Sequence, residues 1–200
     1  TYMSGWTNEN TLCHENGYPG PLHDLLGIHV EDMDVLDDGE HPLGAWLEEF
    51  NFQRKSGTIS IEMLENPLGI EGVFKGRTMC DQIQLQGANA IAAYGAEFYK
   101  GNPAMTVHSY GKGKAYYIGV RMNDAFNRAF YGALCQKLSI EKNIEADIPA
   151  GVIVQERGGY IFIMNFTGEH QRLTLAAPYI NAETGEAVPQ ELQLDAYEVR

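Results

Sequence analysis

The chain has 200 residues, 44% of them hydrophobic and 20% charged, a composition that folds around a core and is not typical of disorder. Its net charge of -13 is uneven: residues 1–66 hold 13 acidic and 2 basic residues, residues 67–143 hold 5 and 9, and residues 144–200 hold 9 and 3. The bases of the middle segment are spread along it, so the sequence lacks a dense phosphate-binding stripe and argues against nucleic-acid partners.

Membrane insertion and disulfide-based folding are also disfavoured. No run approaches the ~20 apolar residues of a membrane span, so no membrane partner is expected. The three cysteines, Cys13, Cys80 and Cys135, are odd in number and lack the spacing of a zinc knuckle or a disulfide framework. A reducing compartment, and hence a cytoplasmic location, is predicted.

The N-terminal third is predicted to hold one short helix, one strand and a long loop. Pro21 and Gly27 bracket a helix over residues 22–26, because proline favours the first turn and glycine the position after the last. Residues 28–33 then predict a strand. Residues 35–57 are rich in acids and contain proline and glycine, which predicts a loop.

Residues 1–4 have the composition of a strand at the very start of the chain. A parallel sheet grows by crossover connections, so a strand here would need an earlier strand to pair with. We therefore expect the chain to be a fragment of a longer protein.

The middle of the chain is rich in predicted strands. Residues 58–63 and 82–86 alternate between apolar and polar side chains, and residues 90–94 are more uniformly apolar. Turns between the strands are predicted at Gly69, Gly76 and Gly87.

The run from Tyr94 to Gly119 predicts two apolar strands joined by a Gly-Lys-Gly turn. Gly111 and Gly113 can reverse the chain tightly, and apolar residues such as Met105 and Tyr117 supply the strand faces. The run holds no acid, base or nucleophile placed for chemistry. It is typical of a scaffold.

A longer helix and a small β unit are predicted to follow. Asn123 can cap a helix that ends near Ser139, with apolar side chains at helical spacing. After a linker over residues 141–150, a small antiparallel unit is predicted; its strands are expected over residues 152–157 and 160–166, joined by a Gly158-Gly159 type I′ turn, and around residues 172–175 and 192–194.

The residues that could carry chemistry are few, and the sequence names no catalytic, cofactor or metal residue. The acidic pairs Asp37-Asp38 and Glu48-Glu49 lie in the predicted loop, where they are more typical of a solvated surface. The acidic run over residues 31–40 could hold calcium, but it misses the spacing of an EF-hand loop. The histidines are scattered singly, so no metal centre or cofactor is predicted.

Three segments resemble the trimerisation and C-terminal domains of glycoside hydrolase family 42 β-galactosidases. The segments are Thr1-Tyr2-Met3-Ser4-Gly5 followed by Gly17-Tyr18-Pro19-Gly20-Pro21-Leu22, the central run with Phe98-Tyr99, Gly101-x-Pro103-Ala104-x-Thr106 and Tyr110-Gly-Lys-Gly-x-x-Tyr116-Tyr117, and Tyr160–Thr167 with Thr184-Gly185-Glu186. The central run is the specific part of this resemblance.

The resemblance implies a fold and a role. Residues 1–140 would be the C-terminal part of a strand-rich α/β trimerisation domain, similar to flavodoxin-like amidotransferase domains, and residues 141–200 an all-β antiparallel C-terminal domain. The parent enzyme would hydrolyse terminal β-D-galactosyl groups of galactosides with retention. Its catalytic barrel, which carries both carboxylates, would lie N-terminal to this chain. The chain itself is expected to be inactive and to form a homotrimer.

Two alternatives stay open. A sugar-binding β module would expose aromatic side chains such as Tyr160, Phe162 or Tyr179 on one sheet face. An amidotransferase-like enzyme would use Cys13 with His14, or Cys80, as a nucleophile, although neither cysteine has the flanking glycines of a nucleophile elbow.

A further expectation concerns the aromatic residues of the central run. Tyr94, Phe98, Tyr99, Tyr110, Tyr116 and Tyr117 belong to a core or a subunit interface by their strand spacing, and the family resemblance favours the interface.

Overall fold

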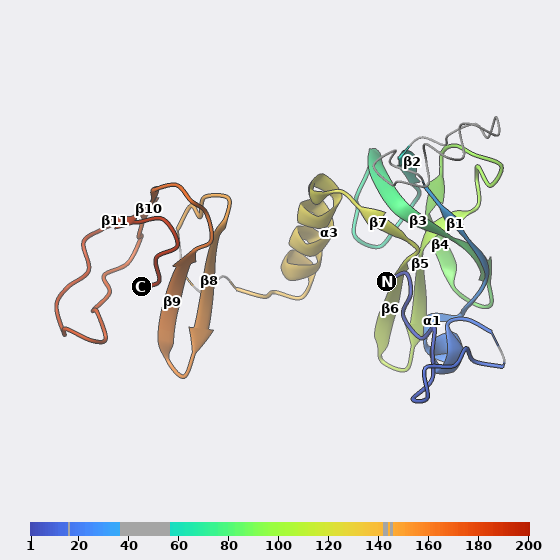
Figure 1. Cartoon of the computed structure of the whole chain (residues 1–200), viewed down its shortest axis with the longest axis horizontal. Coiled ribbons are helices and arrows are strands. Elements are labelled where there is room, and N and C mark those ends of the chain that lie inside the picture. Colours follow the sequence, from blue (N-terminus) through green and yellow to red (C-terminus); the bar gives the residue numbers. More distant parts are fainter. Residues whose placement is uncertain (16, 37–56, 142–143, 145) are drawn as a thin grey trace. The chain divides into compact units, whose positions relative to one another are not determined.

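The computed structural model describes residues 1–15, 17–36, 57–141, 144 and 146–200. These residues divide into two compact units, Thr1–Leu138 and Ser139–Arg200 (Figure 1). No helix among the described residues is long and apolar enough to cross a membrane. Three features predicted from the sequence lie wholly or partly outside the described residues: the acidic pairs at 37–38 and 48–49, most of the predicted loop over 35–57, and residues 37–40 of the acidic run over 31–40.

Unit 1 is built on a seven-stranded sheet with few helices. The strands follow the order β1-β3-β2-β4-β5-β6, and β7 pairs with β3 off this path. The helices are the 3-10 turn η1 (Gly20–Leu22), α1 (His23–Leu26) and α3 (Asp124–Lys137); the strands are β1 (Ile28–Val35), β2 (Thr58–Met63), β3 (Val73–Leu85), β4 (Asn89–Tyr94), β5 (Pro103–Tyr110), β6 (Gly113–Ile118) and β7 (Val120–Met122).

Every strand pair described in this sheet is antiparallel. The expectation of a parallel sheet is therefore wrong for the described strands. Residues 1–4 form a turn instead of a strand, and Tyr2 donates its backbone N–H to the Ile118 carbonyl oxygen at 2.8 Å. The strand-rich character of the unit is as the sequence predicts.

Strand β3 is longer than the sequence predicts and runs through Gly76. Its first half pairs with β2, its second half pairs with β1, and Gly76 lies opposite Met122 of β7. The predicted turn at Gly76 is therefore wrong. A Cβ at this position would lie 2.5 Å from Val120 Cγ2, so the glycine serves close packing. By contrast, Gly69 and Gly87 do lie in turns between strands.

The central hairpin is confirmed with two differences in detail. Strands β5 and β6 pair from Met105↔Ile118 to Tyr110↔Gly113. Of the two turn glycines, Gly111 has a positive φ of 56° and Gly113 does not. The second strand also stops at Ile118, because Gly119 separates it from β7, which pairs with β3 instead.

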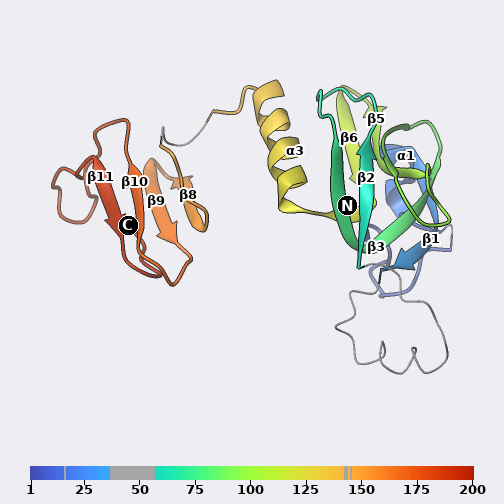
Figure 2. The ribbon, with the colours of Figure 1, turned by 90° about the horizontal axis from the view of Figure 1, so that it is seen from above.

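Helix α3 covers one face of the sheet (Figure 2). Asn123 caps it as predicted, since its side chain accepts a hydrogen bond from the Phe126 N–H at 3.1 Å. Phe126 and Phe130 are buried in a cluster with sheet residues such as Ile59 and Ile61. A second cluster joins α1 and the preceding loop to the sheet through residues including Leu26, Ile28 and Tyr117.

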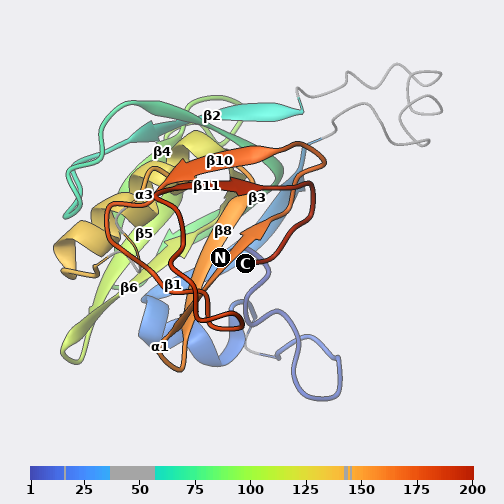
Figure 3. The same ribbon diagram turned by 90° about the vertical axis from the view of Figure 1, so that its left-hand side faces the viewer.

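Unit 2 is a small antiparallel β unit, as predicted. Its strands β8 (Val152–Arg157) and β9 (Tyr160–Asn165) form one pair, and β10 (Gln171–Thr174) and β11 (Glu191–Leu194) form the other (Figure 3). The Gly158-Gly159 turn has positive φ at both residues, 61° and 81°, which a type I′ turn requires. The unit has its own core, which includes Val152, Ile163, Leu173, Leu192 and Leu194.

Candidate functional site

The most unusual polar group of unit 1 is the Asp81 side chain, which is 0% exposed on β3. Its Oδ2 accepts a hydrogen bond from the Tyr117 hydroxyl of β6 at 2.6 Å. The Tyr18 hydroxyl lies 2.6 Å from the same Tyr117 oxygen, so three side chains distant in sequence form one chain of hydrogen bonds. The other carboxylate oxygen, Oδ1, is buried without a hydrogen-bond partner among the described residues.

Burial is the main electrostatic influence on Asp81. Removal from water disfavours the charged carboxylate and raises its pKa to about 6, and the hydrogen bond from Tyr117 opposes part of this rise. Burial likewise raises the pKa of Tyr18 to about 12 and lifts that of Tyr117 well above its ordinary value. Asp81 is a single carboxylate, so the network can hold or release one proton but does not supply a carboxylate pair.

Neighbouring aromatic residues belong to the core. Tyr94 and Tyr99 are 1% and 2% exposed and meet edge to face, with ring centroids 5.0 Å apart. The Tyr99 hydroxyl donates to Asp34 Oδ2 at 2.8 Å, and the Tyr94 hydroxyl donates to the carbonyl oxygens of Asp81 and Gly119. Tyr117 is also buried. The expectation of an interface role is therefore wrong for these three tyrosines, because their own domain encloses them.

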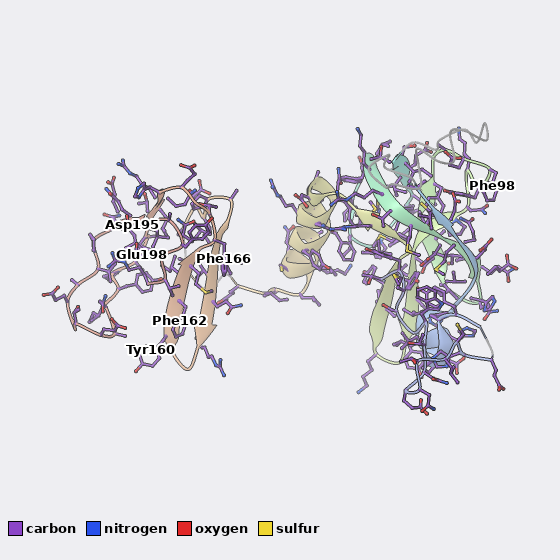
Figure 4. The ribbon with its side chains drawn as sticks, viewed as in Figure 1. Phe98, Tyr160, Phe162, Phe166, Asp195 and Glu198 are labelled. Carbon is purple, nitrogen blue, oxygen red and sulfur yellow. The ribbon has the colours of Figure 1, made fainter. Side chains whose placement is uncertain are left out.

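The remaining aromatics of the central run differ in exposure. Tyr116 is half-buried against Phe130 of α3, with the ring centroids 5.6 Å apart. Tyr110 is exposed near the hairpin turn, and Phe98 is 81% exposed at the margin of unit 1 (Figure 4). Phe98 and Tyr110 stay candidates for an interface.

Unit 2 exposes apolar side chains on the outer face of β9. Tyr160 and Phe162 are 58% and 41% exposed, and they lie close to the turn of the hairpin (Figure 4). Because they are two residues apart on a strand, they share a face. Arg157 and Gln155 lie directly opposite them on β8. Tyr179, in contrast, packs against the core of unit 2.

The cysteines named by the amidotransferase alternative are not arranged for catalysis. Cys80 is buried, and burial raises the pKa of its thiol to about 11, so it is protonated at neutral pH. Cys13 is exposed, and no hydrogen bond joins it to His14 among the interactions of the described residues. No group of three or more potential metal ligands is found within the described ranges.

Sequence reasoning missed the Asp81 network. Asp81 looks like an ordinary polar residue next to an alternating strand, and its partners Tyr18 and Tyr117 lie 63 and 36 residues away. The only hint of burial in the sequence is that Asp81 lies between the apolar residue Cys80 and the alternating segment 82–86, which has one apolar face. That signal does not reveal whether a carboxylate points inward or outward.

Two sequence profiles match the chain. The profile of the β-galactosidase trimerisation domain matches residues 1–141, and that of the β-galactosidase C-terminal domain matches residues 151–200. The chain belongs to the β-galactosidase trimerisation-domain family. Because the second profile matches as well, the chain carries the trimerisation and C-terminal domains of glycoside hydrolase family 42.

Curated relatives agree with this assignment. Beta-galactosidase Pbg of Clostridium perfringens is 38% identical over 205 residues, and beta-galactosidase BglY of Alicyclobacillus acidocaldarius is 37% identical over 205 residues. Each match covers 100% of this chain and 27% of the relative. The trimerisation and C-terminal domains described here thus span about a quarter of these relatives.

Solved structures share the fold of the two domains. The cold-adapted β-galactosidase from Rahnella sp. R3 matches with a TM-score of 0.76 and 35% identity, over 100% of this chain and 27% of that one. The family 42 β-galactosidase Gan42B from G. stearothermophilus matches with a TM-score of 0.72 and 31% identity, over 100% and 26%.

Proposed function

We propose that this chain is the assembly part of a β-galactosidase and that three copies associate through unit 1. The observation that carries the proposal is the trimerisation-domain profile over residues 1–141.

The activity of the whole protein is part of the same proposal. The relatives are named β-galactosidases, and the chain covers only about 27% of each. A catalytic barrel outside these residues would hydrolyse the galactoside, and the trimer would hold three barrels around a threefold axis. The contribution of this chain to catalysis would then be positioning instead of chemistry. A cytoplasmic location fits the free thiols of Cys13 and Cys135.

Cross-linking counts the copies in the assembly. After treatment with a lysine-reactive cross-linker, a denaturing gel should show bands of one, two and three chains and none larger. A single band, or a ladder beyond three, would contradict the trimer. In parallel, the chain should release no nitrophenol from a nitrophenyl β-galactoside, and release above a heat-denatured control would contradict the non-catalytic role.

The amidotransferase-like alternative has less support. An activated nucleophilic cysteine needs a lowered pKa, whereas burial raises that of Cys80. The finer assignment of unit 1 as a truncated amidotransferase-like fold also rests on the family resemblance alone, because the described strands pair antiparallel. Slow labelling of Cys13 by iodoacetamide at neutral pH would argue against this alternative.

A second candidate function is sugar binding by unit 2. The observation in its favour is the exposed pair Tyr160 and Phe162 with Arg157 and Gln155 opposite, because aromatic faces stack on sugar rings and these polar groups can bind hydroxyls. Calorimetric titration with lactose separates the functions. Binding heat with the original chain that is absent from the Phe162→Ala variant would support sugar binding by unit 2. An absence of binding heat with the original chain would contradict it.

A further inference from the structure

Unit 1 holds two arginine side chains directly opposite each other. Arg77 of β3 pairs in register with Arg121 of β7, and both residues are exposed. Both line a hollow of about 220 Å³, whose wall also includes Asn127 and Tyr131 of α3. Like charges directly opposite on a sheet repel each other, so the arrangement is unfavourable unless an anion lies between or beside them.

A second hollow extends the positive charge along the strand. It has a volume of about 270 Å³ and is lined by Arg77 and by Lys75, which lies two residues earlier on the same face of β3. Among the described residues, Asp124 is the only acidic one that lines either hollow. Three cationic side chains and one acidic side chain therefore line the two hollows, and Thr1, the first residue of the given sequence, also lines the smaller one.

The three cations have no ion-pair partner within the described part of the chain. The ion pairs found there are His170–Asp195 and Arg200–Glu198, both in unit 2. The backbone beside Arg77 is also irregular: the register of β3 against β7 shifts between Arg77 and Cys80, and Thr78 has a φ of 76°. Such bulges re-aim side chains and are frequent beside functional sites, and a positive φ is rare for a β-branched residue.

We propose that Arg77 and Arg121 bind carboxylates on a neighbouring copy of this chain and thereby align the subunits of the trimer. This inference rests on the proposed function and adds the residues and the recognition chemistry. A threefold interface is head to tail, so a patch on one subunit meets a different patch on the next. Acidic groups for this role are present in the described N-terminal part of the chain, where Glu9, Glu15, Asp24, Glu31 and Asp32 are exposed and residues 1–36 include no lysine or arginine. The planar guanidinium groups suit carboxylates, which they can bind with two parallel hydrogen bonds.

The test compares charge reversal at the pair with the same charge change elsewhere. The variants are Arg77→Glu, Arg121→Glu and their combination, with the combination of Arg157→Glu and Arg172→Glu, two exposed arginines of unit 2, as the charge-matched control. Because both arginines are exposed, the variants should fold, and circular dichroism checks that they do. The milder variants Arg77→Gln and Arg121→Gln remove the positive charge without adding a negative one. Sedimentation equilibrium of the 200-residue chain gives the association constant at low and high salt.

The expected result is specific to the pair. The double reversal should weaken association roughly tenfold or more at low salt, while the charge-matched double reversal in unit 2 should leave it close to the original value. Association of the original chain should weaken as salt rises, and the Gln variants should lose most of that salt dependence. If the double variant associates as tightly as the original chain, the inference about Arg77 and Arg121 is wrong, whereas the proposed trimer is not contradicted.

Two further results would overturn the inference in different ways. A monomeric original chain at every concentration would overturn both the trimer and this inference. Binding of inorganic phosphate that requires Arg77 and Arg121, with association unchanged in the variants, would assign the hollow to a free anion and overturn the role of a neighbouring copy.

Discussion

At the residue scale, Asp81 is the group whose physics is most unusual. A carboxylate with one oxygen bound by Tyr117 and the other unsatisfied is costly to bury in its charged form. The cost appears as the rise of its pKa from 3.8 to about 6. At ~1.4 kcal/mol for each pH unit, ionised Asp81 makes the folded state about 3 kcal/mol less stable at neutral pH than an unshifted carboxylate would.

This linkage has a defined sign. The folded state holds the proton of Asp81 up to about pH 6, whereas the unfolded chain loses it near 3.8. Between these values the folded state binds more protons, so stability falls as pH rises through the window. Asp81→Asn should remove this part of the pH dependence. Urea unfolding at intervals from about pH 4 to 7 measures it, and identical slopes for the two proteins would show that Asp81 does not titrate as described.

At the scale of elements, replacing glycine by alanine should have opposite effects on stability at two positions. At Gly76 the added Cβ would lie 2.5 Å from Val120 Cγ2 between β3 and β7, so Gly76→Ala should cost roughly 1 to 3 kcal/mol. At Gly132, inside α3, nothing lies within 4 Å, and Gly132→Ala should stabilise by about 1 kcal/mol. Thermal unfolding of both variants measures the difference. Equal effects would mean that the tight contact at Gly76 does not constrain the strand.

The cap of α3 gives a second test at this scale. Asn123→Ala removes the acceptor of the Phe126 N–H and should cost about 1 kcal/mol. Asn127→Ala, the same change one turn later, should be neutral or slightly stabilising, because alanine favours a helix interior. Denaturant unfolding compares the two, and an equal loss at both positions would rule out a capping role for Asn123.

The elements that could be predicted from sequence are those with local signals. The hairpin around Gly158-Gly159, the cap at Asn123 and the glycine after α1 depend on neighbours in the chain, and each lies where expected. Strand β3 could not be delimited, because its course through Gly76 depends on pairing with strands far away in sequence.

The candidate sites depend even more on distant residues. Arg77 and Arg121 are brought together by strand register although they lie 44 positions apart, and the hydrogen bond that Asp81 accepts comes from a tyrosine on another strand. The exposed aromatic pair in unit 2 is different. Tyr160 and Phe162 lie on one strand with period two, so their shared face could be predicted from the sequence.

At the scale of the molecule, the chain consists of two units, each with its own core. The described residues of unit 1 offer a buried carboxylate and a cationic hollow. The hollow fits the proposed contacts between copies of the chain. The proposed function therefore depends on association of these copies.

Light scattering after size exclusion tests that claim most directly. With a chain of 22.2 kDa, three copies give about 67 kDa, and this mass should persist on dilution into the low micromolar range at moderate salt. A mass of one chain at every concentration would contradict the account, because it would show that these 200 residues do not hold subunits together.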